Sequence, residues 1–224
     1  MKGTLDKVAA VTGSASGVGA AVAAELADQG WDVFGVDLDE PGAGHEGVAA
    51  DLTRREGNQL AIDRALDRFG RIDAVVANAG FQHVASIEEM PEDVWEAIIA
   101  LLLTSPFLLA KYSWPHLVAS GAGRFVVISS AHGLVASPFK APYVSAKHGA
   151  IGLVKTMALE AADHGITATA VCPSYVRTPL LESQIAAQAA AHNISEERVL
   201  GVIPDHVVHP GCFYEVKGTA VRWR

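Results

Sequence analysis

Short apolar segments alternate with longer helical segments along this chain, and this alternation restricts the fold more than any other feature. Six continuous apolar runs are typical of buried strands, at residues 7–12, 31–37, 47–51, 72–77, 124–129 and 167–172. Helical patterns separate most of them, at residues 17–29, 58–69, 91–120 and 143–162. Strands that alternate with helices usually pair in parallel, with helices on both faces of the sheet. The sequence therefore predicts an α/β fold with a doubly wound parallel sheet.

Two places interrupt the regular alternation. Residues 38–47, which join the second and third strands, include Pro41, Gly42 and Gly44 and are too few for a full crossover helix. The long helix at residues 91–120 is expected to bend near Pro106, because proline has no N–H to donate. No repeat or linker divides the chain, so residues 1–200 are predicted to form one domain.

Composition excludes several classes of protein. Half of the 224 residues are apolar and 19% are charged, which favours a packed core over disorder. The net charge of −8 argues against nucleic acid and anionic membranes as partners. Two cysteines cannot build a disulfide framework, and residues 1–6 are polar and lack the apolar core typical of a secretory leader. The apolar stretch at residues 98–110 is too short to span a bilayer. We therefore expect a soluble, cytoplasmic protein.

A glycine-rich turn follows the first strand. In TGSASGVG, residues 12–19, Gly13, Gly17 and Gly19 would let backbone amides approach a pyrophosphate at the start of the next helix. The second strand ends about 20 residues later in Asp37, whose carboxylate can accept hydrogen bonds from a ribose. The same carboxylate would repel a 2′-phosphate. The pattern indicates a dinucleotide site that prefers NAD to NADP, although an acid at a strand end can also be a plain surface residue.

A second group of polar residues follows the fifth strand. Tyr143 and Lys147 are four residues apart on one helix face, and Ser130 ends the preceding strand. A nearby ammonium is expected to lower the pKa of the tyrosine, which could then take a proton from an alcohol. Ser130 could hold the same oxygen. Without the other motifs, such a pair would usually be a buried tyrosine beside a lysine that reaches solvent.

Several motifs together resemble the short-chain dehydrogenase/reductase family. They occur in the family's order over about residues 5–200: TGSASGVG, Asp51-Leu52, Asn78-Ala79-Gly80, Ser130, Tyr143 with Lys147, and Cys172-Pro173. The resemblance implies a Rossmann-like domain, a homo-tetramer and a Ser130, Tyr143 and Lys147 catalytic core. The implied NAD-binding residues are Gly13, Ser14, Gly17, Val18, Gly19, Asp37, Asp51, Leu52, Asn78, Tyr143, Lys147, Pro173 and Val176.

A narrower resemblance concerns the substrate. Residues 78–84, 129–149 and 175–185 are similar to those of bacterial D-3-hydroxybutyrate dehydrogenases, a branch of the family. That resemblance implies reversible oxidation of the small anionic hydroxy acid (R)-3-hydroxybutyrate to acetoacetate. The implied substrate-binding residues are Gln82, Ser130, His132, Lys140, Tyr143, Tyr175 and Gln184. A cation with neutral donors suits a small carboxylate, although Lys140 and His132 could also lie in a solvated loop.

The chain departs from the family's pattern at one helix position. The family usually has an asparagine there, which holds a water in a proton relay from the lysine, and the matching residue is Leu102. Thr104, Ser105 or the backbone would have to order that water, or turnover would suffer. Tyr175 also stands where a tryptophan is common.

The last 24 residues, 201–224, do not resemble the family's ending. Residues 216–223 could supply a substitute strand, and without one the sheet edge would be open. His206, His209 and Cys212 are spaced three apart, but no fourth ligand is evident, so no metal site is expected.

Three alternatives to a hydroxybutyrate dehydrogenase stay open. The chain could be a short-chain dehydrogenase for another small hydroxy acid or alcohol. The leucine and the unusual tail could instead indicate a catalytically impaired NAD-binding protein, or a product that folds poorly.

Overall fold

One sheet runs through the molecule. The computed structural model describes residues 7–39, 41, 45–174, 176, 178–200, 214–217 and 220–223. Within them, eight strands join in the order β3-β2-β1-β4-β5-β6-β7-β8. The first six pair in parallel, namely β1 (Val8–Thr12), β2 (Asp32–Asp37), β3 (Glu46–Ala49), β4 (Ala74–Ala77), β5 (Arg124–Ile128) and β6 (Thr167–Val171). The predicted doubly wound parallel sheet is confirmed.

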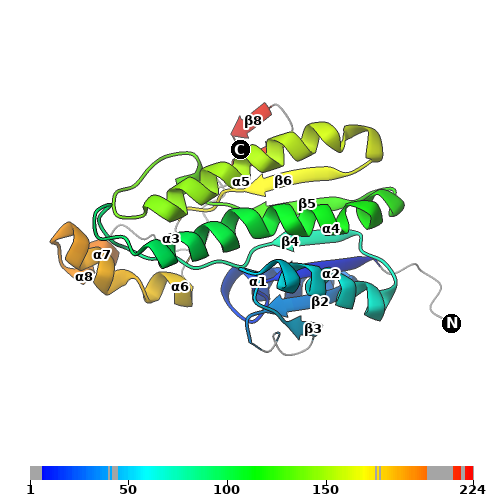
Figure 1. The fold of residues 1–224 in the computed structure, drawn as a ribbon, viewed down its shortest axis with the longest axis horizontal. Coiled ribbons are helices and arrows are strands. Elements are labelled where there is room, and N and C mark those ends of the chain that lie inside the picture. Colours follow the sequence, from blue (N-terminus) through cyan, green and yellow to red (C-terminus); the bar gives the residue numbers. More distant parts are fainter. Residues whose placement is uncertain are drawn as a thin grey trace.

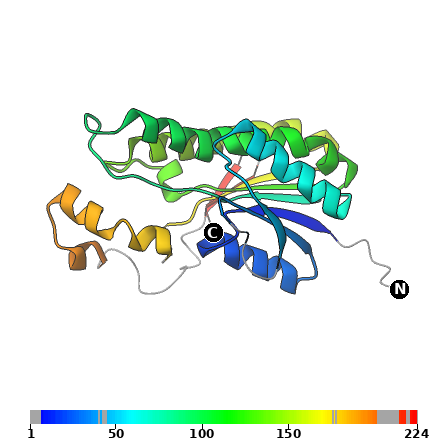
Figure 2. The same cartoon turned by 60° about the horizontal axis from the view of Figure 1, so that its bottom comes forward.

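Helices cover both faces of this sheet (Figure 2). Helix α1 (Gly17–Asp28) lies on one face, where Ala23 packs with Val11 and Val33. The opposite face carries α2 (Arg55–Phe69), α4 (Ser105–Ala119) and α5 (Ala141–Glu160) over the larger core cluster. Consecutive strand residues face opposite layers, so both layers need apolar side chains. This explains the continuous apolar runs of the strands.

The long helix predicted at residues 91–120 is interrupted where the sequence predicted a bend. Helix α3 (Glu92–Ile99) continues through a π-helical segment, η1 (Ala100–Thr104), into α4. The Ser105 N–H donates to the Ala100 carbonyl, five residues back. The next residue, Pro106, has no N–H, so the ordinary four-residue bonding cannot continue there.

This helix also changes the expectation about membranes. The apolar stretch at residues 98–110 is too short for a bilayer, but it is part of the continuous helix Glu92–Ala119, which is long and apolar enough to cross one by length and composition. In the structure it packs against α2, β4 and α5. Length and composition alone do not separate a bilayer span from the core helix of a folded domain.

One prediction from the sequence concerns the connection from β2 to β3, and another concerns the last residues of the chain. No helix occurs in the described part of the β2–β3 connection, as predicted. Residues 216–223, predicted as a single substitute strand, are divided between two strands. Strand β7 (Tyr214–Lys217) pairs antiparallel with β6, and β8 (Ala220–Trp223) pairs antiparallel with β7.

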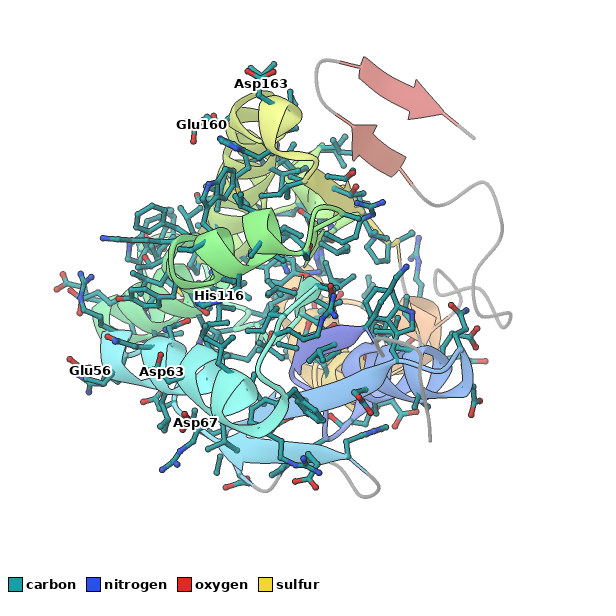
Figure 3. The ribbon with its side chains drawn as sticks, turned by 90° about the vertical axis from the view of Figure 1, so that its right-hand side faces the viewer. Glu56, Asp63, Asp67, His116, Glu160 and Asp163 are labelled. Atoms are coloured by element: carbon teal, nitrogen blue, oxygen red, sulfur yellow. The ribbon has the colours of Figure 1, made fainter. Side chains whose placement is uncertain are left out.

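Three short helices lie beyond the carboxyl ends of the parallel strands (Figure 1). They are α6 (Pro179–Glu182), α7 (Ile185–His192) and α8 (Glu196–Leu200). Figure 3 shows exposed acidic side chains elsewhere, on the outer side of α2 and at the far end of α5 with the 3₁₀ turn η3 (Ala162–His164). They are Glu56, Asp63, Asp67, Glu160 and Asp163.

Candidate active site

Two adjoining cavities open at the carboxyl ends of the parallel strands. The larger, of about 440 Å³, lies beside the glycine-rich turn after β1, and the smaller, of about 200 Å³, lies beside the ends of β5 and β6. Val18, Asn78 and Thr178 line both. The connections from β1 and β4 leave the sheet in opposite directions, and such a switch point is where doubly wound sheets bind ligands.

The glycine-rich turn needs its glycines for close approach of the backbone. Gly13 has φ +66°, and a Cβ atom on Gly19 would overlap the Gly13 carbonyl oxygen. Asn78 braces this turn, because its Nδ2 donates to the carbonyls of Thr12 (2.9 Å) and Gly13 (3.3 Å). The Thr12 hydroxyl accepts the Asn78 N–H at 2.9 Å. The turn thus leaves a backbone-lined space that suits a pyrophosphate.

Asp37 ends β2 at the edge of the larger cavity, where the sequence analysis expected it. Its carboxylate accepts hydrogen bonds from the N–H groups of Ala15 (2.9 Å) and Leu38 (2.8 Å). Asp51 lines the same cavity, and hydrogen bonds from the side chain and backbone of Thr53 lower its pKa. Negative charge at both positions favours a cofactor without a 2′-phosphate.

Most of the predicted cofactor residues line one of the two cavities. Gly13, Gly17, Val18, Asp37, Asp51, Leu52 and Asn78 line the larger one, while Tyr143, Lys147, Pro173 and Val176 line the smaller one. Gly19 supports the turn from behind. The Ser14 side chain is buried toward Gly35, and neither cavity lining includes it.

The structure brings the three predicted catalytic residues together in the smaller cavity. Ser130 follows β5 and caps a 3₁₀ turn, η2 (Ala131–Gly133), by accepting the His132 N–H at 3.1 Å. Tyr143 and Lys147 lie in the first turns of α5. The Lys147 Nζ donates to the Ile128 carbonyl at 2.6 Å and lies 5.5 Å from the centre of the Tyr143 ring.

The pKa shifts differ from the sequence-based expectation. Burial raises the pKa of Tyr143, and a hydrogen bond with the Ser130 side chain opposes this rise. Burial lowers the pKa of Lys147 to about 8. The pKa of Tyr143 is therefore raised and not lowered as expected, because burial penalises the phenolate more than the neighbouring groups stabilise it.

The predicted substrate residues also line the smaller cavity. They are Gln82, Ser130, His132, Lys140, Tyr143 and Gln184, while Tyr175 lies outside the described residues. Lys140 is only 3% exposed. Burial lowers the pKa of Lys140, and burial followed by the nearby Lys140 charge lowers that of His132. Both pKa values are lowered mainly because a positive charge in this cavity loses contact with water.

A strained residue positions Lys140. Phe139 has φ +63°, which is uncommon for an aromatic residue, and its carbonyl accepts the Ala85 N–H at 3.0 Å. Its ring packs edge-to-face against His192 at the end of α7, with centroids 5.1 Å apart. This contact joins the loop before α5 to the short helices at the carboxyl end of the sheet.

Leu102 is part of the core rather than of the cavity lining. It is buried with Ile98 and Ala146, and a Cβ atom on Gly80 would contact its side chain at 2.7 Å. The Ser105 hydroxyl donates to Asn58 on α2 at 2.6 Å, and Thr104 is exposed. Neither side chain lines the smaller cavity, so neither replaces an asparagine there.

Several residues of the site were not predicted from the sequence, among them Thr12 and Gln188. Thr12 anchors the segment after β4, and Gln188 lines the smaller cavity from α7. The four-residue spacing of Gln188 from Gln184 was visible in the sequence and could have identified it. His206, His209 and Cys212, considered above for metal binding, lie outside the described residues.

Comparison with known proteins agrees with this geometry. The sequence matches the short chain dehydrogenase family over residues 7–189. This chain belongs to the short-chain dehydrogenase family. It is accordingly an oxidoreductase, and the predicted membership is confirmed.

Within this family, the chain is similar to several individual proteins. The chain is 42% identical to D-beta-hydroxybutyrate dehydrogenase of Rhizobium meliloti, over 89% of this chain and 83% of that protein. It is 39% identical to the enzyme of the same name from Cupriavidus necator, over 86% and 79%. Among solved structures, ligand-free aldohexose dehydrogenase of Thermoplasma acidophilum has a TM-score of 0.78 and 31% identity, covering 83% of this chain and 73% of that one.

Proposed function

We propose that this protein interconverts (R)-3-hydroxybutyrate and acetoacetate with NAD as the hydride carrier. The observation that carries the proposal is the placement of Lys140 in the same cavity as Ser130, Tyr143 and Lys147. A buried ammonium next to an alcohol-oxidising group is what a small hydroxy acid requires. The similarity to two D-beta-hydroxybutyrate dehydrogenases supports the same substrate.

The larger cavity fits a dinucleotide. Gly13 and Gly17 leave room for a pyrophosphate at the start of α1, and Asp37 can accept hydrogen bonds from the adenosine ribose. The nicotinamide of such a cofactor supplies the hydride acceptor. We propose NAD rather than NADP because Asp37 and Asp51 both carry negative charge at this edge.

The residues of the smaller cavity then have separate roles. Ser130 and Tyr143 hold the hydroxyl of the substrate, and Tyr143 accepts its proton. Lys147 is held by the Ile128 carbonyl, and its positive charge stabilises the phenolate that forms when the proton leaves. Lys140, Gln82 and Gln184 hold the carboxylate. The walls of the cavity exclude water from the hydroxyl that reacts.

The test is reduction of NAD by the purified protein with (R)-3-hydroxybutyrate. We expect turnover in the wild type and a loss of at least about 100-fold in Tyr143→Phe, which removes the proton acceptor. Lys140→Ala should impair oxidation of the acid but leave oxidation of a neutral secondary alcohol unchanged. Tyr112→Phe, at a partly buried tyrosine on α4 outside the cavity lining, is the matched control.

The outcomes separate the alternatives. Equal effects of Lys140→Ala on acids and neutral alcohols would contradict the hydroxy-acid assignment. Binding of NADH without any turnover, in wild type and variants alike, would instead indicate a catalytically impaired NAD-binding protein.

A further inference from the structure

A second glutamine, Gln188, lies in α7 one turn after Gln184, the N-cap residue of this helix. The N–H of Gln188 donates to the Gln184 carbonyl at 2.9 Å, so the two residues are one helical turn apart. Both side chains line the smaller cavity. Gln188 is 6% exposed, which is unusual for a glutamine on a short helix at the edge of the fold (Figures 1 and 2).

The amide of Gln188 lacks a hydrogen-bond partner. Its Nε2 is buried and has no acceptor among the described residues, and the same is true of Gln82 Nε2 in the same cavity. Buried N–H groups are nearly always paired in folded proteins, because an unpaired one loses its bonds to water without replacement. Two unpaired donors in one cavity indicate that a ligand supplies their acceptors.

The positive charge of the cavity lining indicates which kind of ligand would accept hydrogen bonds from these amides. Lys140 is buried in the lining, and no carboxylate lies within 4.0 Å of its ammonium in the described part of the chain. The described lining contains Lys140 and Lys147 but neither aspartate nor glutamate. A carboxylate has two oxygens that together accept about four hydrogen bonds, enough for an ammonium and several amides.

We propose that Gln188 is a further substrate-binding residue, whose side-chain amide donates a hydrogen bond to the carboxylate of the hydroxy acid. This inference rests on the proposed function, because it assigns a further donor to the same substrate. It places two amides on the anion together with Gln82 and Lys140, one from Gln184 at the N-cap of α7 and one from Gln188 within this helix. The short helix α7 is then a binding element as well as a cover for the cavity.

Packing alone does not account for Gln188. The other residues in the middle of α7 are alanines, so Gln188 is the long side chain that fills the space between this helix and the cavity. Leucine or methionine would fill that space without burying an unpaired amide. A polar group that lowers the stability of the empty protein is expected where it contributes to binding.

The experiment compares Gln188→Leu, Gln188→Glu and the control Gln59→Leu, at an exposed position on α2. For Gln188→Leu we expect KM for (R)-3-hydroxybutyrate to rise about 10-fold or more, with kcat changed by less than about threefold. The dissociation constant of propionate, a carboxylate that does not react, should rise by the same factor. The melting temperature of the ligand-free protein should stay the same or increase, whereas a structural role would lower it.

The charged variant tests which atom of the amide matters. Gln188→Glu keeps the size and the acceptor oxygen but replaces the donor with a negative charge, so it should weaken propionate binding more than Gln188→Leu does. Wild-type affinity for propionate in either variant would overturn the proposal, as would a lowered melting temperature with an unchanged propionate constant. Propionate binding needs no turnover, so failure of this inference is distinguishable from failure of the proposed reaction.

Discussion

Burial sets the electrostatics of individual side chains in the smaller cavity. Tyr143 has a raised pKa and Lys140 a lowered one, and in both cases loss of contact with water is the largest cause. Lys147, with a pKa lowered to about 8, is kept in place by the Ile128 carbonyl. A group in this cavity is charged at low cost only when a ligand or neighbour provides the opposite charge.

The lowered pKa of Lys140 predicts how substrate binding depends on pH. The ammonium that holds the carboxylate is lost as pH rises through this pKa, which lies below the ordinary value for lysine. KM for (R)-3-hydroxybutyrate should therefore rise with pH earlier than an exposed lysine would allow. Initial rates measured at several substrate concentrations across the alkaline range give this profile.

A matched pair of variants isolates the residue responsible. Lys140→Arg keeps its charge throughout the range, so the rise in KM should disappear even if affinity is lower overall. Lys155→Arg, at an exposed position of α5, should behave like wild type. An identical rise in KM in the Lys140→Arg variant would assign the pH dependence to another group.

At the scale of elements, buried polar contacts hold the helices in position around the site. Asn58 on α2 accepts the Ser105 hydroxyl of α4 at 2.6 Å and donates to the carbonyls of Leu52 (2.8 Å) and Arg54 (2.7 Å). Leu52 lies at the larger cavity, so this network connects the helix layer to the site. The π-helical segment before α4 is a second feature of the helix layer. Pro106 accounts for it, because proline has no N–H to continue the ordinary helical hydrogen bonds.

The hydrogen bond from Ser105 on α4 to Asn58 on α2 predicts that two buried serines of α4 contribute differently to stability. Ser105→Ala leaves the Asn58 oxygen without a donor and should lower the free energy of unfolding by about 1–3 kcal/mol. Ser113→Ala, in the same helix, removes a hydroxyl that donates only to carbonyls of its own helix, so it should cost less. Urea titration of the two variants measures both. Equal losses would show that the cross-helix bond contributes nothing specific.

At the scale of the whole molecule, the hairpin near the end of the chain extends the sheet beyond β6. Strand β7 pairs antiparallel with β6, in the register Thr169–Lys217, Ala170–Val216 and Val171–Glu215. Five exposed acidic side chains lie on α2, at the far end of α5 and on the adjoining turn η3 (Figure 3). The described lining of the smaller cavity has none, which suits an anionic substrate.

The pairing of β6 with β7 predicts the effect of truncation. A chain ending at residue 213 exposes the backbone N–H and C=O groups of β6, which form a template for pairing with other chains. We expect more high-molecular-weight material by size-exclusion chromatography with light scattering, and a lower melting temperature. A chain ending at Lys217 keeps β7 and should be less affected. If both truncated proteins match the full chain, the hairpin does not protect this edge.

Much of the framework could be predicted from local sequence. The six parallel strands are continuous apolar runs, and the glycine-rich turn and Asp37 stand in order along the chain. Tyr143 and Lys147 share a helix face because of their four-residue spacing. These features depend on residues that are close in the sequence, so they can be predicted from a single sequence.

Tertiary structure decided the rest, because the partners come from distant segments. Local sequence pattern was enough to predict the sheet, the turn and the residue types that meet at the strand ends. It could not show that Lys147 bonds to the Ile128 carbonyl, since that contact spans 19 residues and depends on how α5 packs on β5. Nor could it show that the Gln188 amide is buried without an acceptor. Desolvation and hydrogen-bond satisfaction depend on the whole surroundings of a group, which exist only after the chain has folded.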